Sequence, residues 1–295
     1  MKTAIFKSEE LQAQFERDGF AKLRLFSEAE INDLKELFKK YVPEDVSAFF
    51  SSSYLDNFEL KSEMSDKIAA IINEKVKEHF ANYRLIGAAF LVKGIGKQSE
   101  MPMHQDWTIV DESKYFAANV WIPLTETTET NGTIEVLKGS QNWNRALRAP
   151  TLPFFFEGHQ ERIRPNLTAI DANIGDVVVL NQAVIHYSKP NLSQELRPAI
   201  TCGLISKEAP LKFHYWNKDT PEKIEVFAQK DDFLLRFEDF HKDIYERPTM
   251  GESKGMFDYA IPKIKESELT EILGPSPEES TSMKPGFIAR LFGRK

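Results

Sequence analysis

The stretch GDVVVLNQAVIHYSKPNLSQELRPAIT, residues 175–201, predicts two strands of a β-rich core. Residues 176–185 form an apolar run that follows a Gly-Asp turn signal, and residues 197–205 form a second one. Short apolar runs bounded by turn residues are typical of strands. His186 follows the first run directly, at a point where a sheet gives way to a loop and a side chain can face a cavity.

The pattern of this stretch extends toward the N-terminus of the chain. Further strands are predicted over residues 85–94, 115–124 and 132–140. Many short strands separated by turn residues indicate a β-sandwich or a barrel. Residues 27–41 and 65–80 instead repeat apolar side chains at helical spacing, and Ser27 begins the first of these helices with a capping-box pattern.

These patterns predict one domain over residues 1–273. It divides into a helical layer (about 1–83), a β core (about 84–206) and a C-terminal helical extension (about 207–273) that includes a helix over 231–245. The Pro/Ser/Glu-rich residues 274–295 are expected to form a flexible linker and a basic tail.

Composition restricts the classes of function. The chain has 295 residues and a net charge of −7, which argues against a nucleic-acid-binding protein because such proteins carry a basic face. Its single cysteine, Cys202, excludes an internal disulfide, thiolate zinc fingers and iron–sulfur clusters. The N-terminus lacks the apolar core of a secretory signal and no apolar run has membrane-spanning length, so we interpret the chain as a cytoplasmic enzyme.

A candidate metal site lies in MPMHQDWTIV, residues 101–110. On a strand, His104 and Asp106 point to the same face, because side chains alternate with a period of two. His159 lies in the irregular segment 141–170, so His186 is the one other histidine from a later strand region of the β core and is the candidate for a third ligand. A short His-x-Asp motif is common by chance, and a surface pair of hydrogen-bonded side chains is the alternative.

Two histidines and one carboxylate on one face of a metal leave the other positions open. This arrangement favours non-haem Fe(II), which uses the open positions for O2 and a cosubstrate. Arg197 begins the strand after His186, and its guanidinium could bind a carboxylate held beside the metal. The alternative is a surface arginine that stabilises the end of a strand.

In three blocks the chain resembles the phytanoyl-CoA dioxygenase-like family of Fe(II)/2-oxoglutarate-dependent oxygenases. The blocks are MHQDW (103–107), WIPLTETTETNGTIEVLKGSQNW (121–143) and the stretch 175–201 with its H-x-S-x-x-N run. They occur in the family's order, and the resemblance extends from about residue 17 to Ile205. It implies a double-stranded β-helix, a jelly-roll or cupin-like fold, with helices packed along one sheet.

The resemblance also implies a reaction. His104, Asp106 and His186 would bind Fe(II), and the protein would use O2 and 2-oxoglutarate to hydroxylate an unactivated C–H bond, with release of succinate and CO2. The presence of Asp106 favours hydroxylation or desaturation over halogenation, because related halogenases have a small residue there. A non-catalytic metal- or ligand-binding β-helix protein, a sensor or scaffold, is the alternative; it would keep the three ligands but would not need Arg197.

Four residues are implied as contacts of the cosubstrate. Arg197 would pair with the distal carboxylate of 2-oxoglutarate, and Ser188 would hydrogen-bond near it. Trp121 and Lys93 match the family's cosubstrate pocket more loosely. A core aromatic is the alternative for Trp121, and a solvated lysine at a strand edge is the alternative for Lys93.

Residues 141–170 interrupt the strand pattern with a long irregular segment, which is expected to act as a lid over the site. The candidate substrate contacts in it are Arg145, Arg148, Phe155, Arg162 and Arg164. Such a lid would suit a small or lipid-like substrate with an anionic group and an apolar body. Solvated arginines and phenylalanines that anchor the segment are the alternative. The sequence leaves the substrate, the hydroxylated position and the oligomeric state open.

The last thirteen residues, MKPGFIARLFGRK (283–295), are basic and would gather their apolar side chains on one side of a helix. A weak contact with a membrane surface is one interpretation of this tail. Docking on the domain and disorder are the alternatives.

Overall fold

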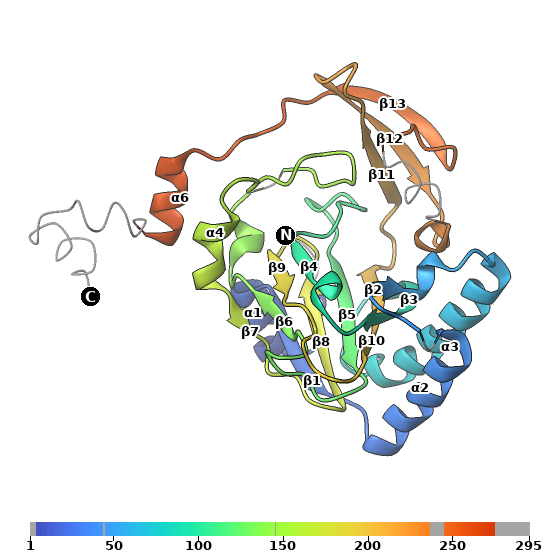
Figure 1. Ribbon diagram of the computed structural model, residues 1–295. Helices are drawn as coiled ribbons and strands as arrows, with labels where there is room; N and C mark the ends of the chain where they lie inside the picture. Colours follow the sequence, from blue (N-terminus) through green and yellow to red (C-terminus); the bar gives the residue numbers. More distant parts are fainter. Residues whose placement is uncertain (1–3, 44, 145, 237–244, 275–295) are drawn as a thin grey trace, which may run out of the picture.

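The main sheet of the computed structural model is antiparallel and six-stranded, in the order β1-β8-β5-β10-β3-β2 (Figure 1). A second antiparallel sheet has the order β4-β9-β6-β7. The structure describes residues 4–43, 45–144, 146–236 and 245–274. The strands of the two sheets are β1 (Phe20–Arg24), β2 (Phe49–Ser51), β3 (Tyr83–Lys93), β4 (Met101–His104), β5 (Ala117–Pro123), β6 (Ile134–Val136), β7 (Thr168–Ala169), β8 (Asp176–Asn181), β9 (His186–Ser188) and β10 (Arg197–Ser206).

The two sheets enclose a core between them. Phe20, Trp121 and Val178 of the six-stranded sheet are buried in one cluster with Ile134 and Val136 of the four-stranded sheet. Burial of such apolar side chains is the main force that holds two sheets together. The predicted double-stranded β-helix is therefore confirmed.

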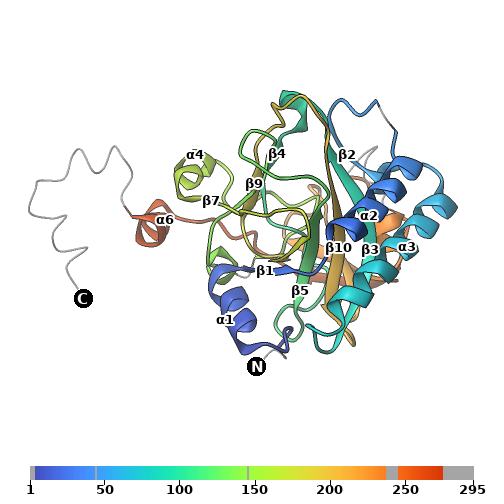
Figure 2. The ribbon, with the colours of Figure 1, turned by 90° about the horizontal axis from the view of Figure 1, so that it is seen from below.

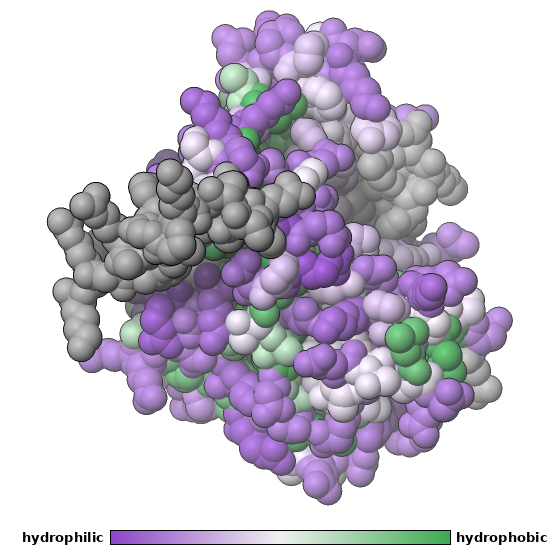
Figure 3. Space-filling view, turned by 60° about the vertical axis from the view of Figure 1, so that its left-hand side comes forward, coloured by the Kyte–Doolittle hydropathy of each residue, from purple (hydrophilic) through white to green (hydrophobic). Residues whose placement is uncertain are grey.

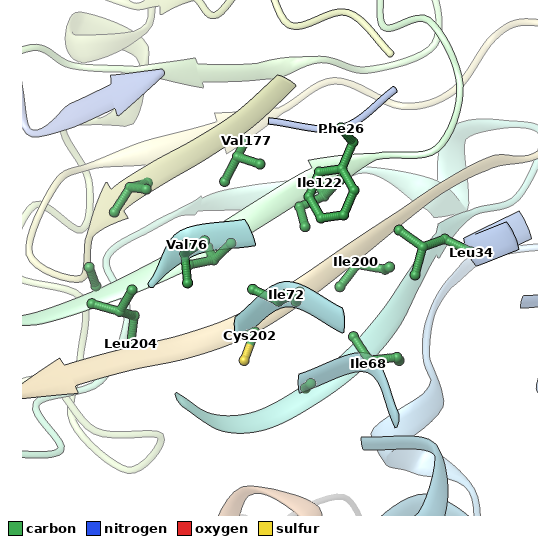
Figure 4. Close-up of a cluster of buried hydrophobic side chains, with 14 of the residues drawn as sticks. Phe26, Leu34, Ile68, Ile72, Val76, Ile122, Val177, Ile200, Cys202 and Leu204 are labelled. Carbon is green, nitrogen blue, oxygen red and sulfur yellow. The ribbon is translucent and has the colours of Figure 1, made fainter. Parts of the chain in front are cut away.

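Helices cover the outer face of the six-stranded sheet, where α2 (Glu28–Tyr41) and α3 (Phe58–Val76) lie side by side (Figures 1 and 2). Figure 4 shows Ile68, Ile72 and Val76 of α3 directed at the side chains of β10. This apolar face repeats every three or four residues, as in a helix that packs on a core. The predicted capping box at Ser27 is present at the start of α2.

The N-terminal layer contains strands as well as helices, which differs from the prediction. After α1 (Glu9–Asp18), the strand β1 pairs with β8, with Phe20 opposite Leu180. Gly19 ends α1 with a φ of +81°, a conformation that glycine adopts without a steric penalty. The five residues of β1 carry too short a pattern to signal a strand without their partner.

The apolar run 176–185 is divided between two sheets. β8 ends at Asn181, whose side chain accepts a hydrogen bond from the backbone N–H of Ala183 at 2.9 Å. This local bond turns the chain, as asparagine side chains commonly do. His186 then begins β9 in the other sheet, rather than following the end of a strand.

The predicted C-terminal helical extension is wrong over most of its described length. It forms a separate antiparallel sheet of β11 (Leu211–Trp216), β12 (Lys223–Gln229) and β13 (Glu252–Asp258). In β11, Leu211, Phe213 and Tyr215 are buried at a spacing of two residues, the period of a strand, and His214 between them is buried as well. Of the predicted helix 231–245, the structure describes a short 3-10 turn, η5 (Phe233–Leu235), while residues 237–244 lie outside the described part.

The chain then runs to a last described helix, α6 (Glu266–Leu273), beside the short helix α4 (Gln160–Ile163) of the 141–170 segment (Figure 1). Hydrophilic residues predominate on the face in Figure 3. Within the described ranges, each helix is too short or too polar to cross a bilayer. The predicted linker from residue 275 onward and the basic tail lie outside these ranges.

Candidate metal centre

His104 and His186 face each other across two paired strands. His104 is the last residue of β4, His186 is the first of β9, and the two form a direct pair in the strand register. Their ring centroids are 4.1 Å apart. Asp106 lies two residues beyond His104, and one ligand atom from each of the three side chains lies within 4.8 Å of the others. The structure therefore brings the three predicted ligands together in an arrangement that can hold one metal ion.

Backbone carbonyls orient both imidazole rings. The Nδ1 atom of His104 lies 2.7 Å from the carbonyl of Pro102, and Nδ1 of His186 lies 3.0 Å from the carbonyl of Val184. A carbonyl can only accept, so Nδ1 is the donor in each ring, and in the neutral imidazole this leaves the lone pair on Nε2. Burial and the neighbouring His186 lower the pKa of His104, which keeps this ring neutral. Neutral rings with a free Nε2 are the form that binds metals.

Asn119, on β5, orients the carboxylate of Asp106. Its Nδ2 atom donates to Oδ2 of Asp106 at 2.7 Å. The other oxygen, Oδ1, lies 3.8 Å from Nε2 of His104, on the side of the two imidazoles. Asn119 therefore occupies one carboxylate oxygen and leaves the second available to a metal.

We expect Asn119→Ala to weaken metal binding about 10- to 100-fold, the usual cost of losing a hydrogen bond to a metal ligand. The freed carboxylate can rotate, while both histidines keep their positions. Calorimetric titration of the metal-free protein with Co(II) measures the effect. The matched control is Asn166→Ala, the same change at an exposed asparagine of η4 (Arg164–Asn166). Equal Co(II) affinity in the wild type and Asn119→Ala would contradict this role.

Arg148 supports the backbone of the metal-binding strand. Its Nε atom donates to the carbonyl of Asp106 at 2.6 Å, and its guanidinium forms an ion pair with Glu112. The backbone N–H of Thr108 donates to the carbonyl of Arg148 at 2.9 Å. With 8% of its surface exposed, Arg148 is engaged by protein groups rather than directed at a bound molecule.

A cavity of about 420 Å³ extends from the triad between the sheets. Arg197 reaches it from the start of β10 and is 4% exposed. Its Nη2 donates to the carbonyl of Gly132 at 3.1 Å, and its guanidinium lies 5.5 Å from the ring centroid of Trp121. No carboxylate among the described residues forms an ion pair with Arg197, and burial lowers its pKa to about 10. A buried cation without a counter-ion is costly, which indicates that this cavity accommodates an anion.

Lys93 lines the same cavity and is 1% exposed, so the alternative of a solvated lysine is wrong. Its Nζ atom donates to the carbonyls of Ser99 at 2.6 Å, Ser188 at 3.1 Å and Lys189 at 2.8 Å. An ammonium has three donors, and all three are used here. Burial, and then the charge of Arg197, lower the pKa of Lys93 to about 7.

Ser188 and Trp121 complete the predicted cosubstrate set, and both line the cavity. The hydroxyl of Ser188 donates to the carbonyl of Gly132 at 2.8 Å, the same carbonyl that accepts from Arg197. Trp121 is 3% exposed and belongs to the core between the sheets. Its ring therefore serves both as a core aromatic and as a wall of the cavity.

The other residues predicted as substrate contacts in the 141–170 segment also have protein partners. Arg162 donates to the Thr270 side chain at 2.9 Å and pairs with Glu266, both on α6. Arg164 lies 4.6 Å from the ring centroid of Tyr187. Phe155 packs edge-on against a neighbouring phenylalanine at 4.7 Å. Arg145 lies outside the described residues.

Sequence reasoning missed Asn119 and Glu112. Asn119 is a polar residue within the apolar run YFAANVWIPL, 115–124, and a lone amide in a buried strand is a signal that could have identified it. Glu112 gave no such signal, because its role depends on Arg148, 36 residues along the chain.

Comparison with known proteins places these features in a family. The family model described as phytanoyl-CoA dioxygenase (PhyH) matches residues 9–199. The phytanoyl-CoA dioxygenase domain-containing protein 1 homolog of Dictyostelium discoideum is 26% identical over 132 residues, 42% of this chain and 47% of that protein. Phytanoyl-CoA dioxygenase 1 of Oryza sativa subsp. japonica is 26% identical over 129 residues, 42% of this chain and 45% of that protein. The chain thus spans about half the length of the curated relatives it matches.

The fold also matches a solved structure, that of the epimerase SnoN in complex with Fe³⁺, alpha ketoglutarate and nogalamycin RO. The TM-score is 0.50 with 15% sequence identity, and the match covers 69% of this chain and 85% of that chain. At this identity the likeness concerns the fold.

Proposed function

The chain belongs to the phytanoyl-CoA dioxygenase (PhyH) family, and from that membership we propose that it is an Fe(II)/2-oxoglutarate-dependent dioxygenase. The observation that carries the proposal is the convergence of His104, Asp106 and His186 at one end of a cavity that also contains Arg197. Two imidazoles and one carboxylate hold a metal from one side and leave its other positions open.

The donor set fits Fe(II). Both imidazoles keep Nε2 available because Nδ1 faces a carbonyl, and Asp106 keeps Oδ1 available because Asn119 binds Oδ2. The single cysteine, Cys202, is fully buried in the core, so the site offers nitrogen and oxygen donors without a thiolate. This set suits non-haem iron rather than structural zinc.

The cavity fits 2-oxoglutarate. Its buried guanidinium at Arg197 lacks a carboxylate partner among the described residues, and a distal carboxylate would supply one. We assign Ser188 and Lys93 to positioning, because the Oγ of Ser188 and the Nζ of Lys93 already donate to backbone carbonyls around Arg197. The Trp121 ring lies within cation–π distance of the guanidinium, at 5.5 Å, and forms part of its surroundings.

The chain's own contribution to the reaction is to bind, to orient and to exclude water. When bound, Fe(II) and 2-oxoglutarate would supply the oxidising chemistry, in which O2 is consumed, succinate and CO2 are released and a C–H bond is hydroxylated. His104 and His186, on the paired strands β4 and β9, and Asp106, just beyond β4, would hold the metal, and Arg197 would set the direction in which the cosubstrate lies. Fixed geometry of this kind supplies much of the rate enhancement in such sites. The retained Asp106 supports hydroxylation or desaturation.

Substrate-independent turnover tests this proposal. We expect purified protein with Fe(II), ascorbate and 2-oxoglutarate to form succinate slowly, and a chelator to stop it. Calorimetric titration of the metal-loaded protein with 2-oxoglutarate should show saturable binding. Metal binding without 2-oxoglutarate binding and without succinate would contradict the proposal and favour the non-catalytic scaffold.

A further inference from the structure

A second cavity, of about 210 Å³, adjoins the metal centre. It shares His104, Gln105 and Trp107 with the larger cavity, so the two meet at one of the three candidate ligands, His104. The shared residues lie at the end of β4 and just beyond it. Two distant segments form the remaining walls, residues 146–155 and residues 259–262.

Most of the side chains in these walls are apolar, although backbone and shared side-chain atoms also give the lining polar surface. The lining side chains outside the shared ones are those of Ala146, Leu147, Arg148, Ala149, Pro150, Leu152, Pro153, Phe154, Phe155, Tyr259, Ile261 and Pro262. Arg148 is the one charged member of this set, and its guanidinium is already bound by Glu112 and by the carbonyl of Asp106. Among the described residues, the walls therefore offer aromatic and aliphatic contacts but no free cation.

A hydrogen bond fastens the two walls to each other. The backbone N–H of Leu147 donates to the hydroxyl oxygen of Tyr259 at 2.9 Å. Farther along the 141–170 segment, Arg162 binds Thr270 and the carbonyl of Gly274 at 2.9 and 2.6 Å. The cavity is thus held in shape by contacts between the 141–170 segment and the C-terminal segment, which indicates a formed site rather than a gap between loose loops.

We infer that this second cavity receives the part of the substrate that is oxidised, and that this part is uncharged and apolar, about the size of one ring or a short branched chain. The inference rests on the proposed function for its link to the metal. An apolar cavity of about 150 Å³ takes up benzene, so 210 Å³ accommodates a single substituted ring. A carboxylate in this cavity would lose its hydration without gaining a cation.

This inference replaces the anionic substrate that the arginine-rich segment suggested. In the 141–170 segment, Arg148 binds Glu112, Arg162 binds α6, and Arg164 lies against the Tyr187 ring. Phe154 and Phe155 line the cavity, so Phe155 is kept as a predicted substrate contact. The inferred substrate therefore keeps the apolar body that the sequence suggested, without an anionic group in this cavity.

Binding of two probes with the same ring tests the inference. Benzyl alcohol is uncharged and benzoate is an anion. Ligand-observed NMR measures both dissociation constants on the full chain loaded with Zn(II), which cannot turn over, and saturated with 2-oxoglutarate, so that the carboxylate site at the metal and Arg197 is already filled. We expect benzyl alcohol to bind at least about tenfold more tightly than benzoate, as expected when the anion loses its hydration. Benzoate binding equal to or tighter than that of benzyl alcohol would overturn the proposal.

Filling the cavity provides the second arm of the test. Leu152→Trp should weaken benzyl alcohol binding at least about tenfold, whereas the control Leu192→Trp, at a residue 58% exposed, should leave it unchanged. If Leu152→Trp does not fold, Phe155→Ala serves instead, and it should increase the affinity for the larger 2-naphthalenemethanol. No change in either variant would overturn the assignment of the cavity.

A parallel titration with 2-oxoglutarate separates this inference from the proposed function. Leu152→Trp should bind 2-oxoglutarate as the wild type does, because Arg197 does not line the second cavity. Loss of selective benzyl alcohol binding with intact 2-oxoglutarate binding would refute the substrate class alone. Failure of the wild type to bind 2-oxoglutarate would refute the proposed function alone.

Discussion

His186→Ala is expected to lower succinate formation at least about 1,000-fold, equivalent to about 4 kcal/mol of transition-state stabilisation. The imidazole faces His104 across β4 and β9, so its removal leaves one imidazole and one carboxylate, too few donors to hold the metal from one side. Metal affinity should fall with activity, and Co(II) titration and a succinate assay measure the two effects.

The fold of this variant should be retained. The His186 side chain makes one recorded hydrogen bond to protein, from Nδ1 to the carbonyl of Val184, and such a bond contributes about 1 kcal/mol. Thermal unfolding of the metal-free protein checks this, with His79→Ala as the matched control outside the site. Wild-type succinate formation by His186→Ala would refute its assignment as a ligand.

Arg197→Met is expected to raise the KM for 2-oxoglutarate at least about 100-fold, because removing one member of a buried charge pair costs about 2–5 kcal/mol. Metal affinity should remain, since Arg197 is not among the three ligands. Arg197→Lys should recover part of the affinity, because it restores the charge without the two-pronged geometry. The matched control is Arg24→Met, at an arginine whose side chain is 62% exposed.

Stability distinguishes a binding arginine from a structural one. Without 2-oxoglutarate, Arg197 is a buried cation with no described carboxylate partner, so Arg197→Met should unfold at the same or a higher denaturant concentration than the wild type. Addition of 2-oxoglutarate should stabilise the wild type and not the variant. A variant that is destabilised yet binds 2-oxoglutarate normally would assign Arg197 to the structure of the strand end and would favour the scaffold.

Local patterns in the sequence accounted for much of the fold. The helix that begins at Ser27 and the strands around residues 85–94 and 197–205 carry their own periodicity and end signals, and the structure has them close to the predicted bounds. The C-terminal sheet was missed, although Leu211, Phe213 and Tyr215 alternate as in a strand. A six-residue alternation is a weak signal unless the pairing strand is known.

The metal centre, too, has features that the sequence indicates and features that depend on the tertiary structure. The two-residue spacing of His104 and Asp106 can be read from the sequence. In the structure β4 ends at His104, so the convergence of the two side chains depends on the path of the chain beyond the strand rather than on strand alternation. The pairing of His104 with His186 depends on the register between β4 and β9, which only the tertiary structure decides. The resemblance to the family anticipated that pairing; strand periodicity did not.

By itself the sequence determined the local elements, the candidate ligands and the resemblance that led to the family. Only the tertiary structure decided what Arg148, Arg162 and Arg164 bind. Arg148 reaches Glu112 across 36 residues and Arg162 reaches Thr270 across 108. Periodicity and turn chemistry act over a few neighbouring residues, whereas an ion pair depends on which distant segments the folded core brings within reach.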